Sequence, residues 1–459
     1  MLHTTLPLLL ALTQTSDAAL RADGALVLGQ SKTFELSAPA HAGRFYFCGL
    51  SSSVRPGIAT SGGVIGLGWD PLLQYALQQG PALGLCGQLD AQGRASFELA
   101  VPNDPSFEGL EVAAAYAVID PFVLPGIVDV SNTVERRVRA SDTTPSFAAI
   151  DTVLESYSDS WLVKDGIAFV FVQNGRILHA SAFGDIALDT RVPYASSTKW
   201  VSGAALMRAV DMGIVSLDDR LSDFLPSFSG AKSGITFAQA FSHTSGLPGG
   251  EACLGQPTVT LQQCAAAIGA GPLVSLPGTQ FRYGGQSMQA AGAALQIASG
   301  RAFEAFVIQE LCQPIGAHTF AYDGFGPTPN PRVAGGGKGT VLDYAPLLEL
   351  ALEWGAVDGR RILSTQSAFA LVADQTADAQ FEADPLPFSV GYGVGGWVED
   401  EDPLALTTRF SSPGAFGAYP WVDFELGYGA FVLVDRSTAE TLELMTDLRP
   451  LCEAIARQL

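Results

Sequence analysis

A β-hairpin is strongly encoded near residue 170 of the chain. Two apolar segments, Ile167–Gln173 and Arg176–Phe183, flank the dipeptide Asn174-Gly175. Asn-Gly fits the tight turn between adjacent antiparallel strands, because both residues tolerate a positive φ. Whatever this chain folds into must therefore contain a sheet that includes this hairpin.

The patterns around the hairpin alternate between helix and strand. A mostly apolar stretch from Trp200 to Met212, ended by Gly213, predicts a buried helix with a glycine beyond its end. Helical patterning also precedes the hairpin from about Phe147, and Ser437 is placed to cap a final helix. Further helices are expected over 260–268, 285–299, 302–311 and 343–354, and strands over 393–398, 419–424 and 429–434. Strands on both sides of a helical block predict one sheet that both ends of this region complete.

Residues 20–135 predict a small all-β domain. Short apolar or alternating runs, typical of strands, are separated by Gly, Pro, Asn and Asp. The runs are Ala25–Leu28, Arg44–Cys48, Ser96–Val101 and Val112–Ile119. We expect a sandwich or barrel that serves packing or recognition, because it holds no cluster of His, Cys or carboxylates at ligand spacing. The polar stretch 136–145 is typical of a linker, and a second domain starts at residue 146.

Residues 1–19 are expected to be a signal peptide. Leu6–Leu12 resembles the short apolar core of such a segment, although no Lys or Arg precedes it. This feature predicts a secreted or periplasmic protein. Elsewhere, no apolar run reaches the ~18 residues of a membrane-spanning helix.

Charge excludes one class of partner. The chain has 46 acidic against 25 basic residues, a formal net charge of −21, and Lys and Arg form no local cluster. A nucleic-acid partner is therefore excluded. The sequence does not indicate an oligomeric state.

Six cysteines, at positions 48, 86, 253, 264, 312 and 452, allow up to three disulfides. Cys48–Cys86 and Cys253–Cys264 are the pairings that are local in sequence, and Cys312–Cys452 would remain. The alternative is six free buried thiols. In an exported protein we expect the Cys253–Cys264 bond, because turn residues lie between the two.

The search for reactive groups leaves one motif. The chain has no H-E-x-x-H, no G-x-S-x-G and no phosphate-binding loop, so we expect neither a metal nor a cofactor. S-x-x-K occurs twice, as Ser196–Lys199 and as Ser229–Lys232. Ser229 lies in a loop, whereas Ser196 opens the buried helix that follows Tyr194.

The helical context gives the first copy a chemical rationale. Positions i and i+3 of a helix share one face, so Lys199 can reach Ser196. The helix N-terminus offers free N–H groups that favour a developing anion. A desolvated lysine can act as a base toward the hydroxyl. The alternative interpretation is a simple N-cap serine followed by a surface lysine.

Two later segments support the catalytic interpretation. Tyr283 lies in a turn before a helix, where its hydroxyl could relay a proton. The glycine-rich segment 411–417 could present a backbone N–H to an oxyanion. A half-buried tyrosine and an ordinary turn are the alternatives.

Taken together, residues 146–459 resemble the serine β-lactamase-like superfamily, in particular its branch of class C β-lactamases, penicillin-binding-protein-like peptidases and β-lactamase-type carboxylesterases. The segments that carry the resemblance are 195–200 (ASSTKW), 215–219 (VSLDD), 242–247 (SHTSGL), 277–283 (PGTQFRY) and 313–316 (QPIG). The resemblance implies an α+β fold, an α/β/α sandwich with an antiparallel sheet, and an all-α insertion over about 200–330. The active site would lie in the cleft between the α/β/α sandwich and the all-α insertion.

The resemblance also implies residue roles. Ser196 would be the acylated nucleophile, Lys199 its base and Tyr283 a second proton carrier. The backbone N–H groups of Ser196 and Ala415 would form the oxyanion hole. His243 would be structural.

Two departures from the family pattern affect the expected substrate. The family's Tyr-x-Asn reads Tyr283-Gly284-Gly285 here, and its Lys-Thr-Gly or His-x-Gly reads Ser412-Pro413-Gly414. Gly285, Ser412 and Gly414 are thus the expected substrate-binding positions, without the amide and the cation. Loss of one charge-assisted hydrogen bond weakens recognition of an anionic amide by about ten- to a hundredfold.

The predicted function is therefore a serine hydrolase of small esters, of carboxylesterase type. The alternatives are a D-amino-acid peptidase or carboxypeptidase, a β-lactam hydrolase, and an inactive binding scaffold. The expected partner is a small-molecule ester or amide.

Overall fold

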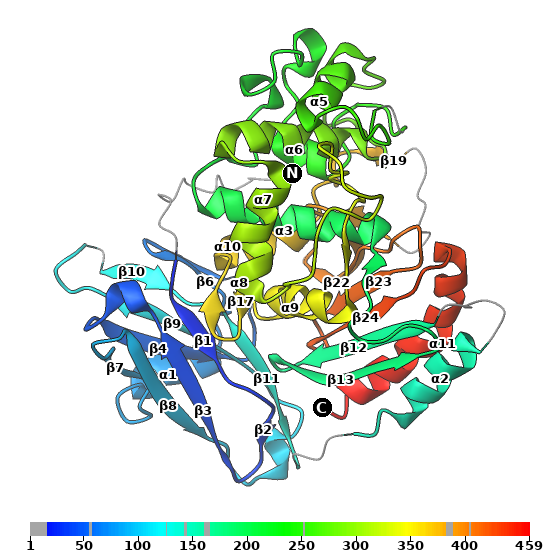
Figure 1. Ribbon diagram of the computed structural model, residues 1–459. Coiled ribbons are helices and arrows are strands. Elements are labelled where there is room, and N and C mark those ends of the chain that lie inside the picture. Colours follow the sequence, from blue (N-terminus) through cyan, green and yellow to red (C-terminus); the bar gives the residue numbers. More distant parts are fainter. Residues whose placement is uncertain are drawn as a thin grey trace.

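The computed structural model describes residues 16–54, 57–124, 126–141, 145–159, 166–250, 253–381, 389–403 and 405–459. An N-terminal β-rich part lies beside a larger part of mixed helix and strand (Figure 1). The predicted fold class, α+β with a β-rich N-terminal region, is confirmed.

Two sheets form the N-terminal part. The first has the order β1 (Ala19–Arg21), β3 (Ser31–Ser37), β8 (Arg94–Ala100). The second has the order β2 (Leu26–Val27), β11 (Val134–Arg139), β9 (Glu111–Ile119), β4 (Phe45–Ser51), β7 (Cys86–Gln88), with β10 (Ile127–Val130) also paired to β9. The hairpin β5 (Ile58–Thr60) and β6 (Gly63–Ile65) and the helix α1 (Pro71–Gln79) complete it. Phe34 of the first sheet and Tyr116 of the second lie in one core, which indicates a sandwich.

A seven-stranded antiparallel sheet forms the centre of the larger part. Its order is β13 (Arg176–Phe183), β12 (Ile167–Gln173), β24 (Tyr428–Leu433), β23 (Tyr419–Asp423), β22 (Thr407–Ser411), β21 (Trp397–Glu401), β20 (Gly391–Tyr392). The Asn-Gly hairpin is confirmed with its predicted bounds. Since β12 pairs with β24, both ends of the region complete one sheet, as predicted.

Helices cover both faces of this sheet. Side chains alternate along β12, so that Ile167 and Phe169 face one core and Ala168 and Val170 the other. The first core lies under α2 (Ala148–Ser158) and α11 (Thr438–Ala456) (Figure 1).

The second core is covered by the helices between β13 and β20. These are α3 (Thr198–Asp211), α4 (Phe237–Phe241), α5 (Leu261–Ala270), α6 (Gln286–Ser299), α7 (Phe303–Val307), the π-helical η6 (Ile308–Cys312), α8 (Gln313–Ile315), α9 (Val341–Leu352) and α10 (Thr365–Val372). Three short strand pairs join the loops: β14 (Val192–Pro193) with β16 (Lys338–Gly339), β15 (Gln280–Phe281) with β19 (Gln380–Phe381), and β17 (Ala356–Val357) with β18 (Arg360–Arg361).

The predicted boundaries need three corrections. Residues 136–139, expected in the linker, belong to β11. Leu6–Leu12 lies outside the described residues, but Ala18 and Ala19, assigned to the leader, are buried and Ala19 begins β1. The strand expected at 393–398 starts only at Trp397, because 393–396 form the turn between β20 and β21.

One of the three possible disulfides is present. The Cys253–Cys264 bond is confirmed, whereas the other four cysteines are free. Cys86 pairs with Phe47 across β4 and β7, so Cys48 points to the opposite face of the sheet.

Buried polar contacts join the two parts. Arg136 of β11 forms an ion pair with Glu353 at 2.9 Å, and both side chains are less than a tenth exposed. Beside it, Trp354 Nε1 donates to Glu135 at 2.7 Å. Because a buried charge without its partner is costly, this pair fixes how the β-rich part docks.

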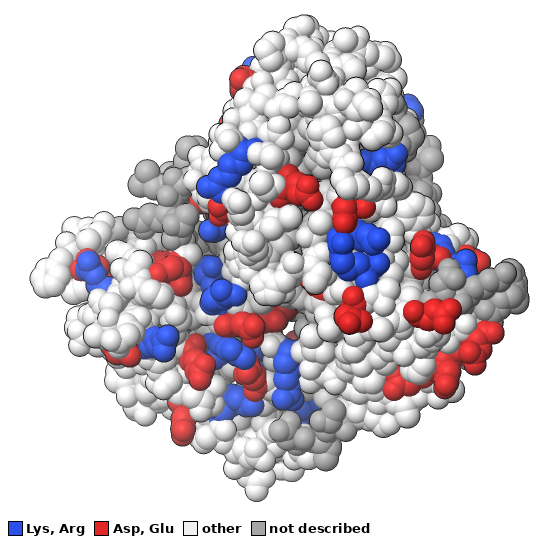
Figure 2. All heavy atoms as spheres, in the orientation of Figure 1, with Lys and Arg blue, Asp and Glu red and all other residues white. Residues whose placement is uncertain are grey.

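The surface in Figure 2 intersperses Lys and Arg with Asp and Glu, without a basic patch among the described residues on that face. Within the described residues, no helix combines the length and apolar character needed to cross a membrane.

Candidate active site

Ser196 and Lys199 are held together at the start of α3. Ser196 lies in the 3₁₀ turn η3 (Ala195–Ser197), which runs directly into the helix. Lys199 Nζ lies 2.9 Å from Ser196 Oγ. Ser196 is half-buried and Lys199 is 3% exposed, so the alternative of a surface lysine is wrong. Ala195, before the serine, has φ +46°, a strained conformation for a residue with a side chain.

A backbone carbonyl holds Lys199 from a second side. Lys199 Nζ donates to the Ala334 oxygen at 2.8 Å. Gly335, the next residue, lies beside the serine segment, because a Cβ on it would be 3.7 Å from the Ala195 carbonyl oxygen. Among the described residues, no carboxylate lies within 4 Å of Nζ to form an ion pair. Sequence reasoning missed Ala334, because an accepting carbonyl carries no residue-specific signal.

Tyr283 contacts Lys199 through its ring. Lys199 Nζ lies 4.5 Å from the ring centroid, and the ring also stacks on Trp397 at 5.2 Å between centroids. Within the described residues the Tyr283 hydroxyl forms no hydrogen bond with Ser196 or Lys199. The structure therefore brings Tyr283 to the pair, but shows a cation–π contact where a proton relay was expected.

The turn between β22 and β23 reaches the serine segment through Gly414. A Cβ on Gly414 would lie 2.2 Å from the Tyr194 carbonyl oxygen, so only glycine allows this approach. Ala415 follows in the turn, exposed, and its N–H donates to no backbone acceptor among the described residues. The first N–H groups of a helical segment also lack an internal acceptor, which applies to Ser196. The geometry therefore leaves both donors available to an anion.

Ser412 differs from its expected role. Its side chain is 2% exposed, and its hydroxyl donates to the backbone carbonyls of Ser196 at 3.1 Å and Gly395 at 3.3 Å. It therefore fastens the sheet edge to the serine segment, and its contact with substrate stays a prediction. The single hydrogen of the hydroxyl is thus engaged with main-chain carbonyls.

Gly285 caps α6 without a side chain that could bind substrate. A Cβ at this position would lie 2.6 Å from Leu254 Cδ1 and 3.9 Å from Ala334 Cβ. Position 285 thus borders the carbonyl-bearing residue that holds Lys199. The place of the family's asparagine is partly filled by Leu254.

The second S-x-x-K copy is structural. Lys232 Nζ donates to the carbonyls of Gly269 and Gly271, both at 2.5 Å, at the end of α5. A cation at a helix C-terminus satisfies carbonyls that have no other donor. The Lys232 amine thus contacts the end of α5, and Lys232 meets Ser229 only through its backbone N–H among the described residues.

His243 packs behind Tyr283 as a neutral ring. Its ring lies 4.7 Å from that of Tyr283 and 4.9 Å from that of Tyr392, and neither nitrogen has a hydrogen-bond partner among the described residues. Burial, with the nearby Lys199 charge, holds the pKa of His243 well below its usual range. This agrees with the structural role expected for it.

A second polar cluster lies in the N-terminal part, where none was expected. Asp17, His41 and Asp129 bring ligand-type atoms within 4.8 Å of one another. His41 Nε2 lies 3.1 Å from Asp129 Oδ2, and Ala40 N–H donates to Asp17. Asp17 Oδ1 has no hydrogen-bond partner among the described residues, and the sequence separation of up to 112 residues hid the cluster.

Comparison with known proteins agrees with this architecture. Protein flp of Staphylococcus aureus (strain MW2) is 24% identical over 188 residues, covering 38% of each chain, so this chain spans well under half of that relative. A solved candidate β-lactamase of Bacteroides dorei DSM 17855 is 28% identical with a TM-score of 0.59, covering 66% of this chain and 98% of that one. EstCE1, described as a hydrolase with promiscuous acyltransferase activity, is 20% identical with a TM-score of 0.56 over 68% of this chain and 98% of its own.

The Beta-lactamase family model matches residues 162–449, a range that begins before the Asn-Gly hairpin and ends in α11. It includes the central sheet, the helical block and the Ser196–Lys199 pair. Since this match covers more than half of the chain, the protein belongs to the Beta-lactamase family.

Proposed function

We propose that this protein is a serine hydrolase that cleaves small neutral esters through an acyl-enzyme on Ser196. The observation that carries the proposal is the 2.9 Å contact between a half-exposed serine hydroxyl and a buried lysine amine. A nucleophile within hydrogen-bond reach of its base is the arrangement that covalent catalysis requires. The match to the Beta-lactamase family and the fold shared with EstCE1 support it.

In the acylation step, the Lys199 amine accepts the Ser196 hydroxyl proton while Oγ bonds to the ester carbonyl carbon. The Ser196 and Ala415 N–H groups donate to the oxyanion that forms, and such donors contribute about 3–4 kcal/mol each. The new ammonium lies over the Tyr283 ring, which favours a cation at that moment. The carbon–oxygen bond to the leaving group then breaks, and Lys199 returns the proton to the departing alkoxide.

Deacylation repeats these steps with water. Lys199 takes a proton from a water molecule whose oxygen attacks the acyl carbon, and the same two N–H groups hold the second oxyanion. Collapse releases the acid and restores the Ser196 hydroxyl. The cycle needs no metal or cofactor to balance.

The ester preference follows from what the site residues offer. A β-lactam or peptide carboxylate would need a cation at position 412, where a buried serine is engaged with main-chain carbonyls. An acylamino group would need an amide at position 285, where a glycine faces Leu254. A neutral ester needs neither contact.

The test compares kcat/KM of the wild-type protein for p-nitrophenyl butyrate, nitrocefin and a D-Ala-D-Ala peptide. We expect the ester value to be the highest by at least tenfold. A nitrocefin or peptide value equal to it would replace the esterase with a β-lactamase or peptidase. Failure of a fluorophosphonate to label the folded protein would indicate an inactive scaffold.

We also propose that the protein works outside the cytoplasm. The Cys253–Cys264 disulfide supports this location, because such bonds persist in oxidising compartments. Cell fractionation followed by thiol counting tests it. Protein confined to the cytoplasm with six free thiols would contradict the proposal.

A further inference from the structure

Leu254 fills the space beside Gly285. The ideal Cβ of residue 285 would lie 2.6 Å from Leu254 Cδ1, closer than side chains pack. Gly285 has φ −96°, a backbone conformation that any residue adopts. The requirement for glycine at position 285 is therefore steric, and Leu254 imposes it.

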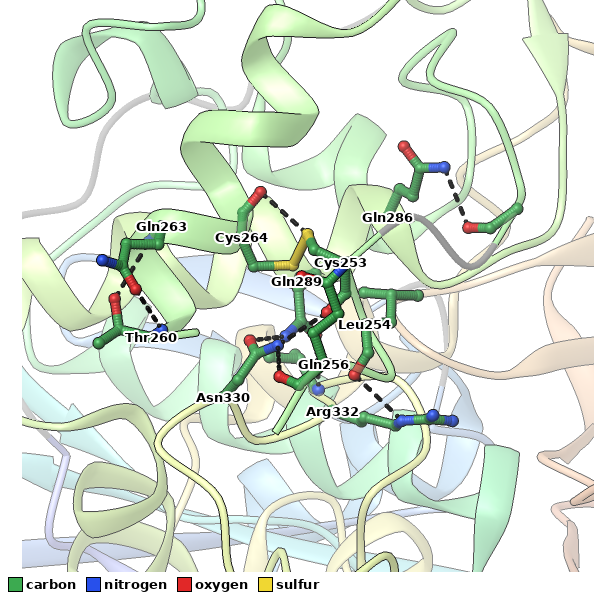
Figure 3. The surroundings of a disulfide bond; sticks show 12 residues. Cys253, Leu254, Gln256, Thr260, Gln263, Cys264, Gln286, Gln289, Asn330 and Arg332 are labelled. Carbon is green, nitrogen blue, oxygen red and sulfur yellow. Dashed lines mark hydrogen bonds between the residues drawn. A yellow bond between two sulfur atoms is a disulfide. The ribbon is translucent and has the colours of Figure 1, made fainter. Parts of the chain in front are cut away.

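The loop that carries Leu254 is fixed at several points (Figure 3). Cys253, its neighbour, is bonded to Cys264 of α5. Arg332 Nε donates to the Leu254 carbonyl at 3.1 Å, and Asn330 Nδ2 donates to the Cys253 carbonyl at 3.0 Å. Leu254 itself is 7% exposed. These contacts fix the backbone of the loop and so place the buried Leu254 side chain beside Gly285.

The same contacts connect this loop to the reactive lysine. Gln289 of α6 donates to Asn330 at 2.8 Å and accepts from the Val333 N–H at 3.0 Å. The next residue, Ala334, supplies the carbonyl that holds Lys199. The space beside Gly285 thus borders Ala334, whose carbonyl positions the base.

We infer that Leu254 is a specificity-determining residue, which restricts the site to esters whose acyl chain is slim and apolar next to the carbonyl. The inference rests on the proposed ester hydrolysis. An acylamino substituent placed beside Gly285 would meet the Leu254 methyl groups, and its N–H and C=O would lose water without gaining a partner. A polar group left unpaired in this way lowers recognition by about ten- to a hundredfold.

The experiment uses two esters with one leaving group, p-nitrophenyl butyrate and the p-nitrophenyl ester of N-acetylglycine. Leu254→Ala is expected to raise the ratio of kcat/KM for the acylamino ester over the butyrate at least tenfold relative to wild type. Gly250→Ala is the matched control, because among the described residues a Cβ there meets only Gln286 Nε2, at 3.9 Å, and the ratio should not change.

A stability measurement tests the steric claim without relying on activity. Gly285→Ala should lower the melting temperature in the wild-type background and much less in the Leu254→Ala background. Equal losses in both backgrounds would overturn the claim that Leu254 occupies this space.

The outcomes separate this inference from the proposed function. Suppose the wild-type protein hydrolyses the butyrate and Leu254→Ala leaves the kcat/KM ratio of the two esters unchanged. That result overturns the specificity role of Leu254 and leaves the proposed esterase activity in place. Should Leu254→Ala not fold, Leu254→Val removes part of the side chain and is expected to shift the ratio in the same direction by a smaller amount; a wild-type ratio there also overturns the role. If the wild-type protein hydrolyses neither ester, the proposed function fails and this inference fails with it.

Discussion

Gly414→Ala should displace the Ala415 oxyanion donor while leaving Ser196 and Lys199 in place. The added Cβ would lie 2.2 Å from the Tyr194 carbonyl oxygen, whereas ordinary contacts start near 3.4 Å. The turn that carries Ala415 must therefore retreat from the serine segment by about 1 Å. A misplacement of that size costs about 10²-fold in rate, and loss of one oxyanion donor costs about 10²–10³-fold. We expect kcat/KM for p-nitrophenyl butyrate to fall by about 10².

The assay pairs this rate with circular dichroism and a melting curve, so that a folded variant is compared with a folded parent. Gly234→Ala is the matched control, because its Cβ would meet no atom of the described residues within 4 Å and its φ is not positive. It should keep the wild-type rate. A folded Gly414→Ala protein with wild-type kcat/KM would refute the assignment of the Ala415 N–H to the oxyanion hole.

Four other changes test separate contacts. Lys199→Ala should lower kcat/KM at least about 10³-fold, because members of one catalytic unit fail together; a loss below tenfold would contradict its role as base. Tyr283→Phe keeps the ring over the ammonium and should stay within about threefold of wild type, whereas a 10²-fold loss would assign a proton relay to the hydroxyl. Reducing the Cys253–Cys264 bond should lower the free energy of unfolding by about 2–3 kcal/mol in urea titrations, as the chain-entropy model gives for so short a loop; an unchanged value would contradict it. The hydrogen bond to the buried Asp129 carboxylate raises the pKa of His41. The His41–Asp129 pair therefore stabilises the fold below about pH 6.5. Its contribution, at most about 1 kcal/mol, is lost as pH rises through the raised pKa. His41→Asn should therefore flatten the fall in melting temperature above pH 6.5, and an unaltered slope would count against the pair.

Local signals in the sequence predicted the elements whose stability is local. The Asn-Gly hairpin has its predicted bounds because turn and strands agree in one short segment. Ser437 caps α11 together with Glu440, and Thr260 caps α5 with Gln263, so these helix starts could be placed as well. The Ser196–Lys199 contact also follows from spacing alone, since three residues on a helix bring the side chains together.

Features that depend on distant residues were missed or misjudged. The arginines at 136–139 suggested a solvated linker, but Arg136 is buried against Glu353, 217 residues away. Cys312 and Cys452 belong to cores on opposite faces of the central sheet, which no count of cysteines reveals. The β22 strand at 407–411 was missed, because its Thr-Thr-Arg-Phe-Ser pattern gains its burial only from the neighbouring strands.

The same distinction between local and distant signals applies to the residues of the candidate active site. Ser196, Lys199, Tyr283 and the turn with Ala415 were predicted as partners, and the structure brings the first three into contact. The Leu254 side chain that fills the place beside Gly285 was beyond prediction, since a disulfide-bonded loop positions it.

The central claim is that Ser196 carries the acyl group. Reaction with a fluorophosphonate, followed by proteolysis and mass spectrometry, locates the modified residue directly. The account predicts one adduct, on the peptide that contains Ser196, and its loss in Ser196→Ala but not in Ser229→Ala. An adduct on Ser229, or labelling that survives Ser196→Ala, would contradict it.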